Sequence, residues 1–459
     1  MNGPAPAAGA GEPTVLTFGC RLNAWESDVI RRHALAAGLT DAAIVNTCAV
    51  TAEATRQARQ AVRRLHRDAP SRPLIVTGCA AQLDPAVFAA MPGVSHVLGN
   101  AEKLRPASWR ALTGAHGHAA DPSATGARTA RTDVADIMTD TTVPMAPADD
   151  MAGDAAGAFD GRARAFLAIQ HGCDHRCTFC IIPFARGQNR SLPMADIVRR
   201  ARDLLARGFA DVVLTGVDLT SWGHDLAGRP TLGNAVADLL ERVPELNRLR
   251  LSSLDPGAID EPLHRVFASE PRLLAHLHLS VQAGDDMVLK RMKRRHLRHH
   301  VLELVARLRA VRPEAGFGAD LIAGFPTETA PMADNSLALV HEAGLAFLHV
   351  FPYSARPGTP AARMPQVAVA ERRARAARLR RAGDQVLAAF HRQRLGRAAE
   401  VLVETANGDG GGDGRGGDGA IIRLGHARPD DVGRVVRARI IAMGDGRLLA
   451  RRTGLAARS

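Results

Sequence analysis

The sequence predicts an α/β protein in three parts: a small N-terminal α/β domain with a parallel sheet, a central (β/α) partial barrel and a small C-terminal β-barrel. Three observations predict this division. Short apolar runs alternate with helical stretches over residues 14–106, the same alternation returns over residues 161–394, and short strand-like segments follow over residues 395–459. A chain of 459 residues has room for roughly two to four such domains.

The N-terminal part repeats a strand–turn–helix pattern. Apolar runs at 15–18, 43–45 and 74–76 alternate with helical stretches such as residues 53–67. Repeated βα units favour a parallel sheet, because each helix returns the chain to the edge from which the previous strand started.

The central part contains six further strand candidates, which predict a (β/α) barrel, complete or partial. They are residues 166–169, 211–214, 249–251, 276–279, 318–322 and 347–351. A long Arg-rich helix follows at 366–394, with an apolar stripe of Leu379, Val386, Leu387 and Phe390.

Two segments lack such patterns. Residues 107–160 are rich in Ala, Gly, Asp, Thr and Pro, which predicts a flexible linker with some local packing around 133–138. The tail carries strand candidates at 399–404, 421–423, 435–442 and 448–452, and its glycine tract at 407–419 is expected to be a disordered loop.

The overall charge points to a polyanionic partner. The formal net charge is +12, mostly from Arg, which suits RNA; a GC-rich genome that encodes Arg freely is the alternative. The first 13 residues lack the basic and apolar regions of a signal peptide, and no apolar run reaches the ~18 residues of a membrane span. We therefore expect a cytoplasmic protein, whose six cysteines are metal ligands or catalytic groups before they are disulfides.

Three of the cysteines lie on one predicted loop. Cys173, Cys177 and Cys180 are spaced C-x3-C-x2-C directly after a strand. Three thiolates at this spacing can hold three irons of a 4Fe-4S cluster and leave the fourth open to S-adenosyl-L-methionine (SAM), which the reduced cluster can cleave to a 5′-deoxyadenosyl radical. The alternatives are structural cysteines, or a zinc site completed by His171 or His175.

The other three cysteines each follow a predicted parallel strand. Cys20, Cys48 and Cys79 are separated by whole βα units. Because the carboxyl ends of parallel strands meet along one edge of a sheet, these cysteines can converge in space as metal ligands. Three buried core cysteines are the alternative.

These motifs together resemble the radical SAM methylthiotransferase family, whose members convert a C–H bond into C–S–CH3. The resemblance rests on IQHGCDHRCTFCIIPFARG (169–187), TFGCRLNAWES (17–27), VNTCAVT (45–51), VTGCAAQ (76–82), LTGVDLTSWG (214–223), LHLSVQAGDDMVLKRMKRR (277–295), ADLIAGFPTET (319–329) and FPYSARPGTPAARMP (351–365). It implies a second 4Fe-4S cluster on Cys20, Cys48 and Cys79, which carries the sulfur to be inserted.

Several residues at strand ends are candidates for SAM contacts. Asp218 could accept a hydrogen bond from the SAM amine, although a capping Asp is the alternative. Glycine before Phe325 would let backbone approach the adenine, and a plain tight turn explains it as well. The full set is Thr215, Gly216, Asp218, Ser280, Gln282 and Gly324.

Two basic clusters and the tail suggest RNA binding, with solvated helix faces as the alternative. One cluster is the run 290–295; the other is Arg56, Arg59, Arg63, Arg64 and Arg67. The tail, with RPDDVGRVVRARI at 428–440, resembles the TRAM domain, a small RNA-binding β-barrel.

Within the family, the motifs most resemble the branch that acts on N6-threonylcarbamoyladenosine at position 37 of tRNA. Arg356 is a candidate partner for the carboxylate of that base, or else a structural loop residue. The resemblance implies tRNA, an electron donor such as a flavodoxin or ferredoxin, and a sulfur donor as partners. The alternative substrates are isopentenyladenosine-37 of tRNA and an aspartate of a ribosomal protein. A different class of function is a non-catalytic iron–sulfur RNA-binding protein. The TGVD and GFP motifs at strand ends argue against that class, because they predict a SAM site.

Overall fold

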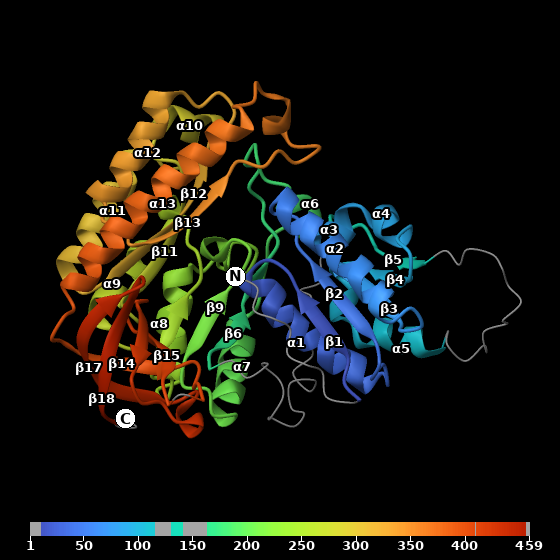
Figure 1. Ribbon diagram of the computed structural model, residues 1–459, viewed down its shortest axis with the longest axis horizontal. Helices are drawn as coiled ribbons and strands as arrows, with labels where there is room; N and C mark the ends of the chain where they lie inside the picture. Colours follow the sequence, from blue (N-terminus) through green and yellow to red (C-terminus); the bar gives the residue numbers. More distant parts are fainter. Residues whose placement is uncertain (1–10, 115–129, 141–162, 409, 456–459) are drawn as a thin grey trace, which may run out of the picture. The chain divides into compact units, whose positions relative to one another are not determined.

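The computed structural model describes residues 11–114, 130–140, 163–408 and 410–455 (Figure 1). The chain forms two compact units: Met1–Asp160 with His171–Arg176 and Cys180–Arg190, and Gly161–Gln170 with Cys177–Phe179 and Ser191–Ser459. Among the described residues, no helix combines the length and apolar character needed to cross a membrane.

The first unit is built on a parallel sheet, as predicted. Its strand order is β1-β2-β3-β4-β5. The strands are β1 (Thr14–Thr17), β2 (Ala43–Thr47), β3 (Leu74–Gly78), β4 (Val94–Leu98) and β5 (Arg131–Asp133). The helices are α1 (Arg21–Ala36), α2 (Ala52–Asp68), α3 (Cys79–Leu83), α4 (Pro85–Ala89), η1 (Glu102–Leu104), α5 (Pro106–Gly114) and α6 (Ile182–Arg186).

Neighbouring residues of the central strands face opposite sides of this sheet and enter separate cores. Ile44 and Ile75 pack with Trp109 under α1 and α5. Val45 and Val76 pack with Phe88 on the other side, under α2, α3 and α4. This period of two is the geometry of a strand that is covered on both faces.

The prediction of a flexible linker over residues 107–160 is wrong where the structure forms helix or strand in that segment. Residues 107–114 belong to α5, because Trp109 and Leu112, three residues apart, are both buried in the core. Residues 131–133 form β5 beside β4. Residues 115–129 and 141–160 lie outside the described residues.

The second unit contains the six predicted strands in a partial barrel. Two parallel sheets, β10-β9-β6 and β11-β12-β13, are joined by isolated parallel bridges from Leu249 to Leu273 and from Leu254 to Leu279. The strands are β6 (Ala165–Ala168), β9 (Val212–Thr215), β10 (Leu249–Leu251), β11 (His276–Gln282), β12 (Gly316–Ala323) and β13 (Phe347–Pro352). The short strands β7 (Gln170–His171) and β8 (Arg190–Ser191) flank the cysteine loop.

Helices follow the barrel strands as βα units require. They are α7 (Met194–Ala206), η3 (Leu219–Ser221), α8 (Leu232–Arg242), η4 (Pro256–Ala258), α9 (Glu261–Ser269), α10 (Asp286–Arg291), α11 (Arg298–Val311), α12 (Ala330–Glu342), η5 (Pro360–Arg363) and α13 (Val369–Arg392). The last is the predicted Arg-rich helix.

The tail closes into the predicted β-barrel, in the order β14-β15-β16-β18-β17 among its described strands. These are β14 (Ala398–Val403), β15 (Gly412–Gly416), β16 (Ile421–Leu424), β17 (Val435–Gly444) and β18 (Arg447–Leu455), with η6 (Pro429–Asp431) before β17.

The expectation that residues 407–419 are a disordered loop is wrong for β15. Gly412 and Gly414 are buried, and a Cβ on them would lie 2.2 Å from the Thr405 carbonyl oxygen and 2.5 Å from that of Leu402. The alternating Asp413 and Arg415 are more exposed and pair with Arg447 and Glu404. Glycine here fits a strand whose inner face has no room for side chains.

Candidate functional site

The structure brings Cys20, Cys48 and Cys79 together at the carboxyl edge of the first sheet. Cys20 caps α1 just after β1, Cys48 follows β2, and Cys79 begins α3 directly after β3. A Cβ on Gly19 would lie only 2.7 Å from the Cys48 sulfur. Burial raises the pKa of Cys48 to about 12, and the neighbouring Cys79 and Cys20 contribute to the increase.

The backbone turns at a glycine directly before two of these cysteines. Gly19 and Gly78 have φ values of +102° and +97°, which L side chains rarely adopt, and they turn the chain at the two strand ends that present Cys20 and Cys79. All six cysteines are among the described residues, and none of them forms a disulfide. Three convergent thiolates are the donor set of an iron–sulfur cluster.

A buried ionic group lies against this cysteine set. The Arg186 side chain donates from Nε to the Cys79 sulfur at 3.1 Å, and its other nitrogens contact Glu26 and Asn23. Lys103 donates to Glu26 at 2.7 Å. The side chains of Glu26, Lys103 and Arg186 are at most 4% exposed, so these charges compensate one another rather than facing water.

This ionic group places the Arg186 guanidinium beside Cys79. Burial alone would raise the pKa of Glu26, but Arg186 and Lys103 lower it to about 2, so the carboxylate is ionised. Burial opposes the charge of Arg186, but Cys79 and Glu26 raise its pKa well above the usual value, whereas burial lowers the pKa of Lys103. N–H donors to a ligating sulfur, such as that of Arg186, stabilise a negatively charged metal group. Sequence reasoning missed these residues, although Glu26 and Arg186 stand inside the motifs TFGCRLNAWES and CTFCIIPFARG.

The loop with Cys173, Cys177 and Cys180 runs between β7 and α6. All three cysteines are half-buried. Gly172 has φ +68°, and a Cβ there would lie 1.7 Å from the Gln188 carbonyl oxygen, so only glycine allows this turn before the first cysteine. The Cys173 N–H donates to the Gly187 carbonyl at 3.0 Å. These contacts fix the start of the loop.

His171 and His175, the two histidines that could complete a zinc site with the loop cysteines, have different surroundings. His171 is buried, its ring centroid lies 5.9 Å from that of Trp25, and burial lowers its pKa to about 3. His171 is therefore a neutral core side chain. His175 lies half-buried within the loop itself.

The candidates after β9 are organised by Gln170, which sequence reasoning did not single out. The Asp218 N–H donates to Gln170 Oε1 at 2.8 Å, and a Cβ on Gly216 would lie 2.6 Å from the same oxygen. The Asp218 carboxylate accepts hydrogen bonds from Thr220 and Ser221. Thr215 is buried at the end of β9. Gln170 and the hydroxyls of Thr220 and Ser221 thus hold the backbone and the carboxylate of Asp218.

Two of the candidates at the ends of β11 and β12 have left-handed backbone, and one of them is not glycine. Gln282 and Gly324 have φ values of +69° and +71°. A Cβ on Gly324 would lie 2.5 Å from the Arg372 side chain, so the close approach seen here is to α13. The Ser280 carbonyl accepts a hydrogen bond from Arg294 at 2.8 Å. A strained non-glycine residue such as Gln282 is typical of functional sites.

The basic run 290–295 is not a uniform phosphate-binding surface, so the prediction is wrong for Arg294. That side chain is 8% exposed, pairs with Asp255 at 3.2 Å and donates toward the Cys177 sulfur at 3.7 Å. The other side chains of the run include Lys290, Lys293 and Arg295, which are all exposed. Arg294 is drawn inward because Asp255 and the Ser280 carbonyl need a buried cationic donor.

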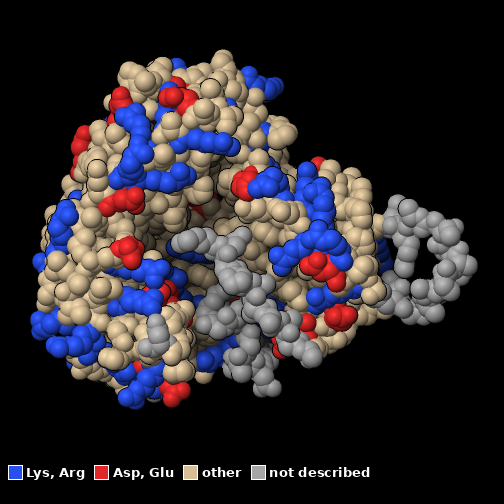
Figure 2. Space-filling view, in the orientation of Figure 1, with Lys and Arg blue, Asp and Glu red and all other residues tan. Residues whose placement is uncertain are grey.

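The basic residues of α2 lie mostly on its surface. Arg56, Arg63, Arg64 and Arg67 reach solvent, and Figure 2 shows Lys and Arg gathered over α2 on this face. Arg59 instead lies over the Phe88 ring, 5.7 Å from its centroid. In the loop after β13, Arg356 is half-buried, and its carbonyl accepts a hydrogen bond from Thr359.

Two family models match the chain. Residues 167–340 match the radical SAM superfamily, and residues 13–99 match the uncharacterized protein family UPF0004. A radical S-adenosylmethionine methyltransferase, TsrM from Kitasatospora setae, has a similar fold, with a TM-score of 0.50 at 17% identity over 74% of this chain and 67% of that one.

Three relatives align with nearly the whole chain. The threonylcarbamoyladenosine tRNA methylthiotransferase MtaB of Rickettsia prowazekii is 46% identical over 86% of this chain and 88% of its own length. The protein of the same name from Bacillus subtilis is 31% identical over 85% and 84%. The tRNA-2-methylthio-N(6)-dimethylallyladenosine synthase of Novosphingobium aromaticivorans is 34% identical over 88% and 89%. The chain therefore belongs to the radical SAM methylthiotransferase family.

Proposed function

We propose that this chain is a tRNA methylthiotransferase that converts N6-threonylcarbamoyladenosine at position 37 into its 2-methylthio derivative. The observation that carries the proposal is the 46% identity, over 393 residues, to a threonylcarbamoyladenosine tRNA methylthiotransferase, against 34% for a dimethylallyladenosine synthase. The alternative of a non-catalytic iron–sulfur RNA-binding protein is set aside, because the chain aligns with these enzymes over most of its length.

Each cysteine set would hold one 4Fe-4S cluster. Cys173, Cys177 and Cys180 would hold the cluster that binds SAM, and Cys20, Cys48 and Cys79 the cluster that carries the sulfur. When bound, these groups supply radical chemistry and sulfur, which the substrate needs because its C2–H bond has no acidic proton for acid–base catalysis.

The protein's own residues bind, orient and exclude water. Arg186, held by Glu26 and Asn23, fixes the Cys79 sulfur. Arg294 donates toward Cys177 and holds the end of β11 through Ser280. Thr215, Gly216, Asp218, Ser280, Gln282 and Gly324 are the residues we propose around SAM, with Gln170 fixing the Asp218 loop.

The RNA must present an exposed base, because C2 of a stacked adenine cannot be reached from outside. An anticodon loop presents such a base. Basic surface for its phosphates comes from the exposed arginines of α2, the exposed residues of the 290–295 run and the C-terminal barrel.

We also propose a reducing, cytoplasmic site of action, where the six unbridged cysteines stay available to clusters. The chemistry requires a low-potential electron donor, such as a flavodoxin or ferredoxin, and a sulfur donor.

Mass spectrometry of tRNA nucleosides from a strain that lacks the gene tests the proposed function. We expect loss of 2-methylthio-N6-threonylcarbamoyladenosine and accumulation of the unthiolated nucleoside. Persistence of that product, with loss of the dimethylallyl derivative or of a ribosomal-protein modification, would assign the chain to another branch of the family.

A further inference from the structure

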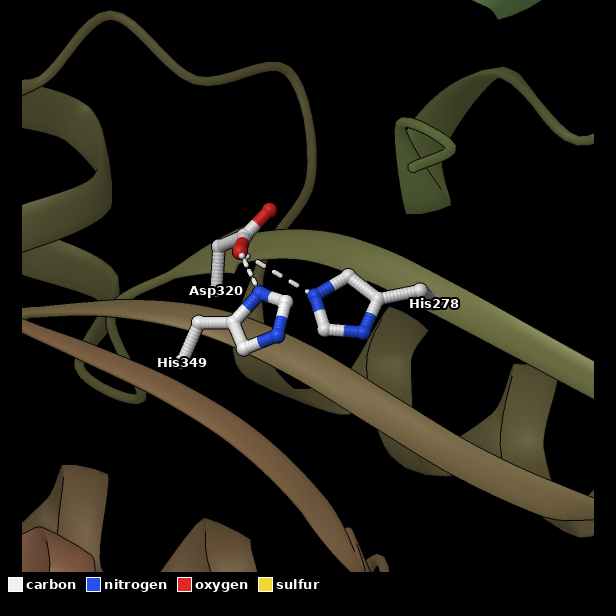
Figure 3. Close-up of side chains that lie close together, drawn as sticks. All are labelled: His278, Asp320 and His349. Atoms are coloured by element: carbon white, nitrogen blue, oxygen red, sulfur yellow. Dashed lines mark hydrogen bonds and ion pairs between the residues drawn. The ribbon is translucent and has the colours of Figure 1, made fainter. Parts of the chain in front are cut away.

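One face of the sheet β11-β12-β13 is apolar and buried, and the other carries polar side chains together with Ile322, Phe347 and Phe351. Leu277, Leu279, Phe317 and Leu321 are at most 1% exposed, and Arg309 of α11 packs over the Phe317 ring. Because side chains alternate along a strand, the intervening residues point to the opposite face. His278, Asp320 and His349 stand there, one on each strand (Figure 3).

These three side chains form one hydrogen-bonded array. Asp320 Oδ1 lies 3.0 Å from His278 Nε2 and 3.1 Å from His349 Nδ1. Asp320 and His349 are direct neighbours across β12 and β13. Gly318 makes room for the array, because a Cβ there would lie 2.4 Å from His278 Nδ1.

Asp320 determines which nitrogen of each ring is a donor. Burial alone would raise the pKa of Asp320, but hydrogen bonds from His278 and His349 hold it well below its usual range. The ionised carboxylate can only accept, so His278 Nε2 and His349 Nδ1 carry the protons. The remaining nitrogen of His349, Nε2, belongs to a side chain that is 57% exposed, whereas His278 is 3% exposed. His349 therefore offers the outward polar contact of the array.

The array includes a residue of β11, the strand whose end contacts the arginine beside Cys177. His278 precedes Ser280 by two residues, about 6.8 Å along an extended strand, and the pairing of β11 with β12 is irregular between Leu279 and Gln282. The Ser280 carbonyl accepts from Arg294 at 2.8 Å, and the same guanidinium reaches toward the Cys177 sulfur at 3.7 Å. Arg294 thus connects the Cys177 sulfur to the end of β11, the strand that carries His278.

We propose that His278, Asp320 and His349 form the subsite for the polar N6 substituent of the substrate base, with His349 Nε2 as the contacting atom. The assignment rests on the proposed function. A threonylcarbamoyl group offers His349 Nε2 amide N–H and hydroxyl donors, whereas a dimethylallyl group offers none. A site built to hydrogen-bond a substituent rejects an analogue that leaves its polar groups unpaired.

The same donor atoms lie within 4.8 Å of one another, a spacing that a divalent metal ion also uses. The hydrogen-bond interpretation is favoured because Asp320 Oδ1 already stands at ordinary hydrogen-bond distance from both ring nitrogens. A metal ion is therefore one of the outcomes to be tested.

The test compares anticodon stem-loop RNAs that carry threonylcarbamoyladenosine or dimethylallyladenosine at position 37. For the cluster-loaded enzyme we would measure the ratio of the two dissociation constants and the ratio of the two kcat/KM values. Wild type should prefer the threonylcarbamoyl RNA, and His349→Ala should reduce that preference about tenfold, which is about 1.4 kcal/mol. His349→Gln should retain part of the preference. His299→Ala, which removes an exposed histidine of α11, should leave it unchanged.

An unchanged preference in His349→Ala would overturn the assignment. So would one additional equivalent of zinc or another non-iron metal in wild type that His349→Ala loses, because the array would then be a metal site. If His349→Ala does not fold, His349→Gln against His349→Phe gives the same comparison. Wild type that modifies neither RNA would contradict the proposed function itself, whereas preference without dependence on His349 would contradict this subsite alone.

Discussion

Cys173, Cys177 and Cys180 come from one short loop, whereas Cys20, Cys48 and Cys79 come from the ends of three strands with whole helices between them. Each set has an arginine directed at one sulfur: Arg294 at Cys177 and Arg186 at Cys79. Arg294 pairs with Asp255, whereas Arg186 shares the carboxylate of Glu26 with the buried Lys103.

The difference shows what each kind of site requires of the fold. A loop can present three thiols through its own spacing, so its flanking residues need only fix where it begins and ends. Thiols from distant strands depend on the packing of the whole first unit, and that packing includes a buried group of charges. We therefore expect the strand-end cysteine set to depend on this buried group of charges.

The largest effect should follow Glu26→Gln. This change leaves Arg186 and Lys103 buried without their carboxylate, and it should lower the free energy of unfolding by about 3–5 kcal/mol. Urea unfolding would measure it, followed by the fluorescence of the buried Trp25 and Trp109 in a background that carries Trp222→Phe. The matched control is Glu53→Gln, which breaks an exposed pair with Arg56 and should change little. Equal stability of the two variants would contradict the role of the buried group.

The same comparison has a defined pH dependence. The pKa of Glu26 is lowered from 4.5 to about 2 in the folded state, so its contribution is complete above pH 4.5 and is lost as the pH falls toward 2. The difference in stability between wild type and Glu26→Gln should therefore shrink over that range. A difference that stays constant down to a pH of about 2 would mean that the ionised carboxylate is not its source.

A smaller effect is expected in the C-terminal barrel. Gly414→Val would place a side chain against the Leu402 carbonyl, where a Cβ has only 2.5 Å, and should destabilise the barrel by about 1–3 kcal/mol. Gly425→Ala is the control, because a Cβ there meets nothing within 4 Å. Thermal unfolding of both variants checks this, and equal melting temperatures would contradict the inward placement of Gly414.

The smallest effect should be on RNA binding through the exposed part of the basic run. Replacing Lys293 and Arg295 by Gln should reduce the salt slope of tRNA binding by about two, because each side chain that binds a phosphate adds about one to that slope. Replacing Arg242 and Arg307, exposed arginines of α8 and α11, removes the same charge elsewhere and should leave the slope nearer to wild type. Equal slopes in the two double variants would mean that residues 290–295 form an ordinary solvated face.

Much of the fold could be predicted because it depends on local pattern. The six barrel strands are visible as apolar runs, and Cys20, Cys48 and Cys79 are visible as residues that follow such runs. The glycine tract is harder to interpret, because its composition is typical of disorder. The strand is indicated only by a short alternation, in which Gly412 and Gly414 alternate with Asp413 and Arg415.

The buried charges could not be predicted in this way. Lys and Glu are almost never fully buried unless paired, and Glu26 and Lys103 are 77 residues apart in the sequence. Arg294 resembles the other charges of a basic run, since nothing local indicates that Asp255 is its partner. Such pairings depend on which strand ends meet, and only the folded structure supplies that information.

The division of labour between the two cysteine sets is tested most directly by comparing Cys48→Ala with Cys177→Ala. Wild type reconstituted without oxygen should carry about eight irons, four for each cluster. Cys48→Ala should still cleave SAM to 5′-deoxyadenosine but form no methylthio product, and Cys177→Ala should do neither. If Cys48→Ala abolished SAM cleavage as fully as Cys177→Ala while its remaining cluster stayed intact, the two sets would not have separate roles.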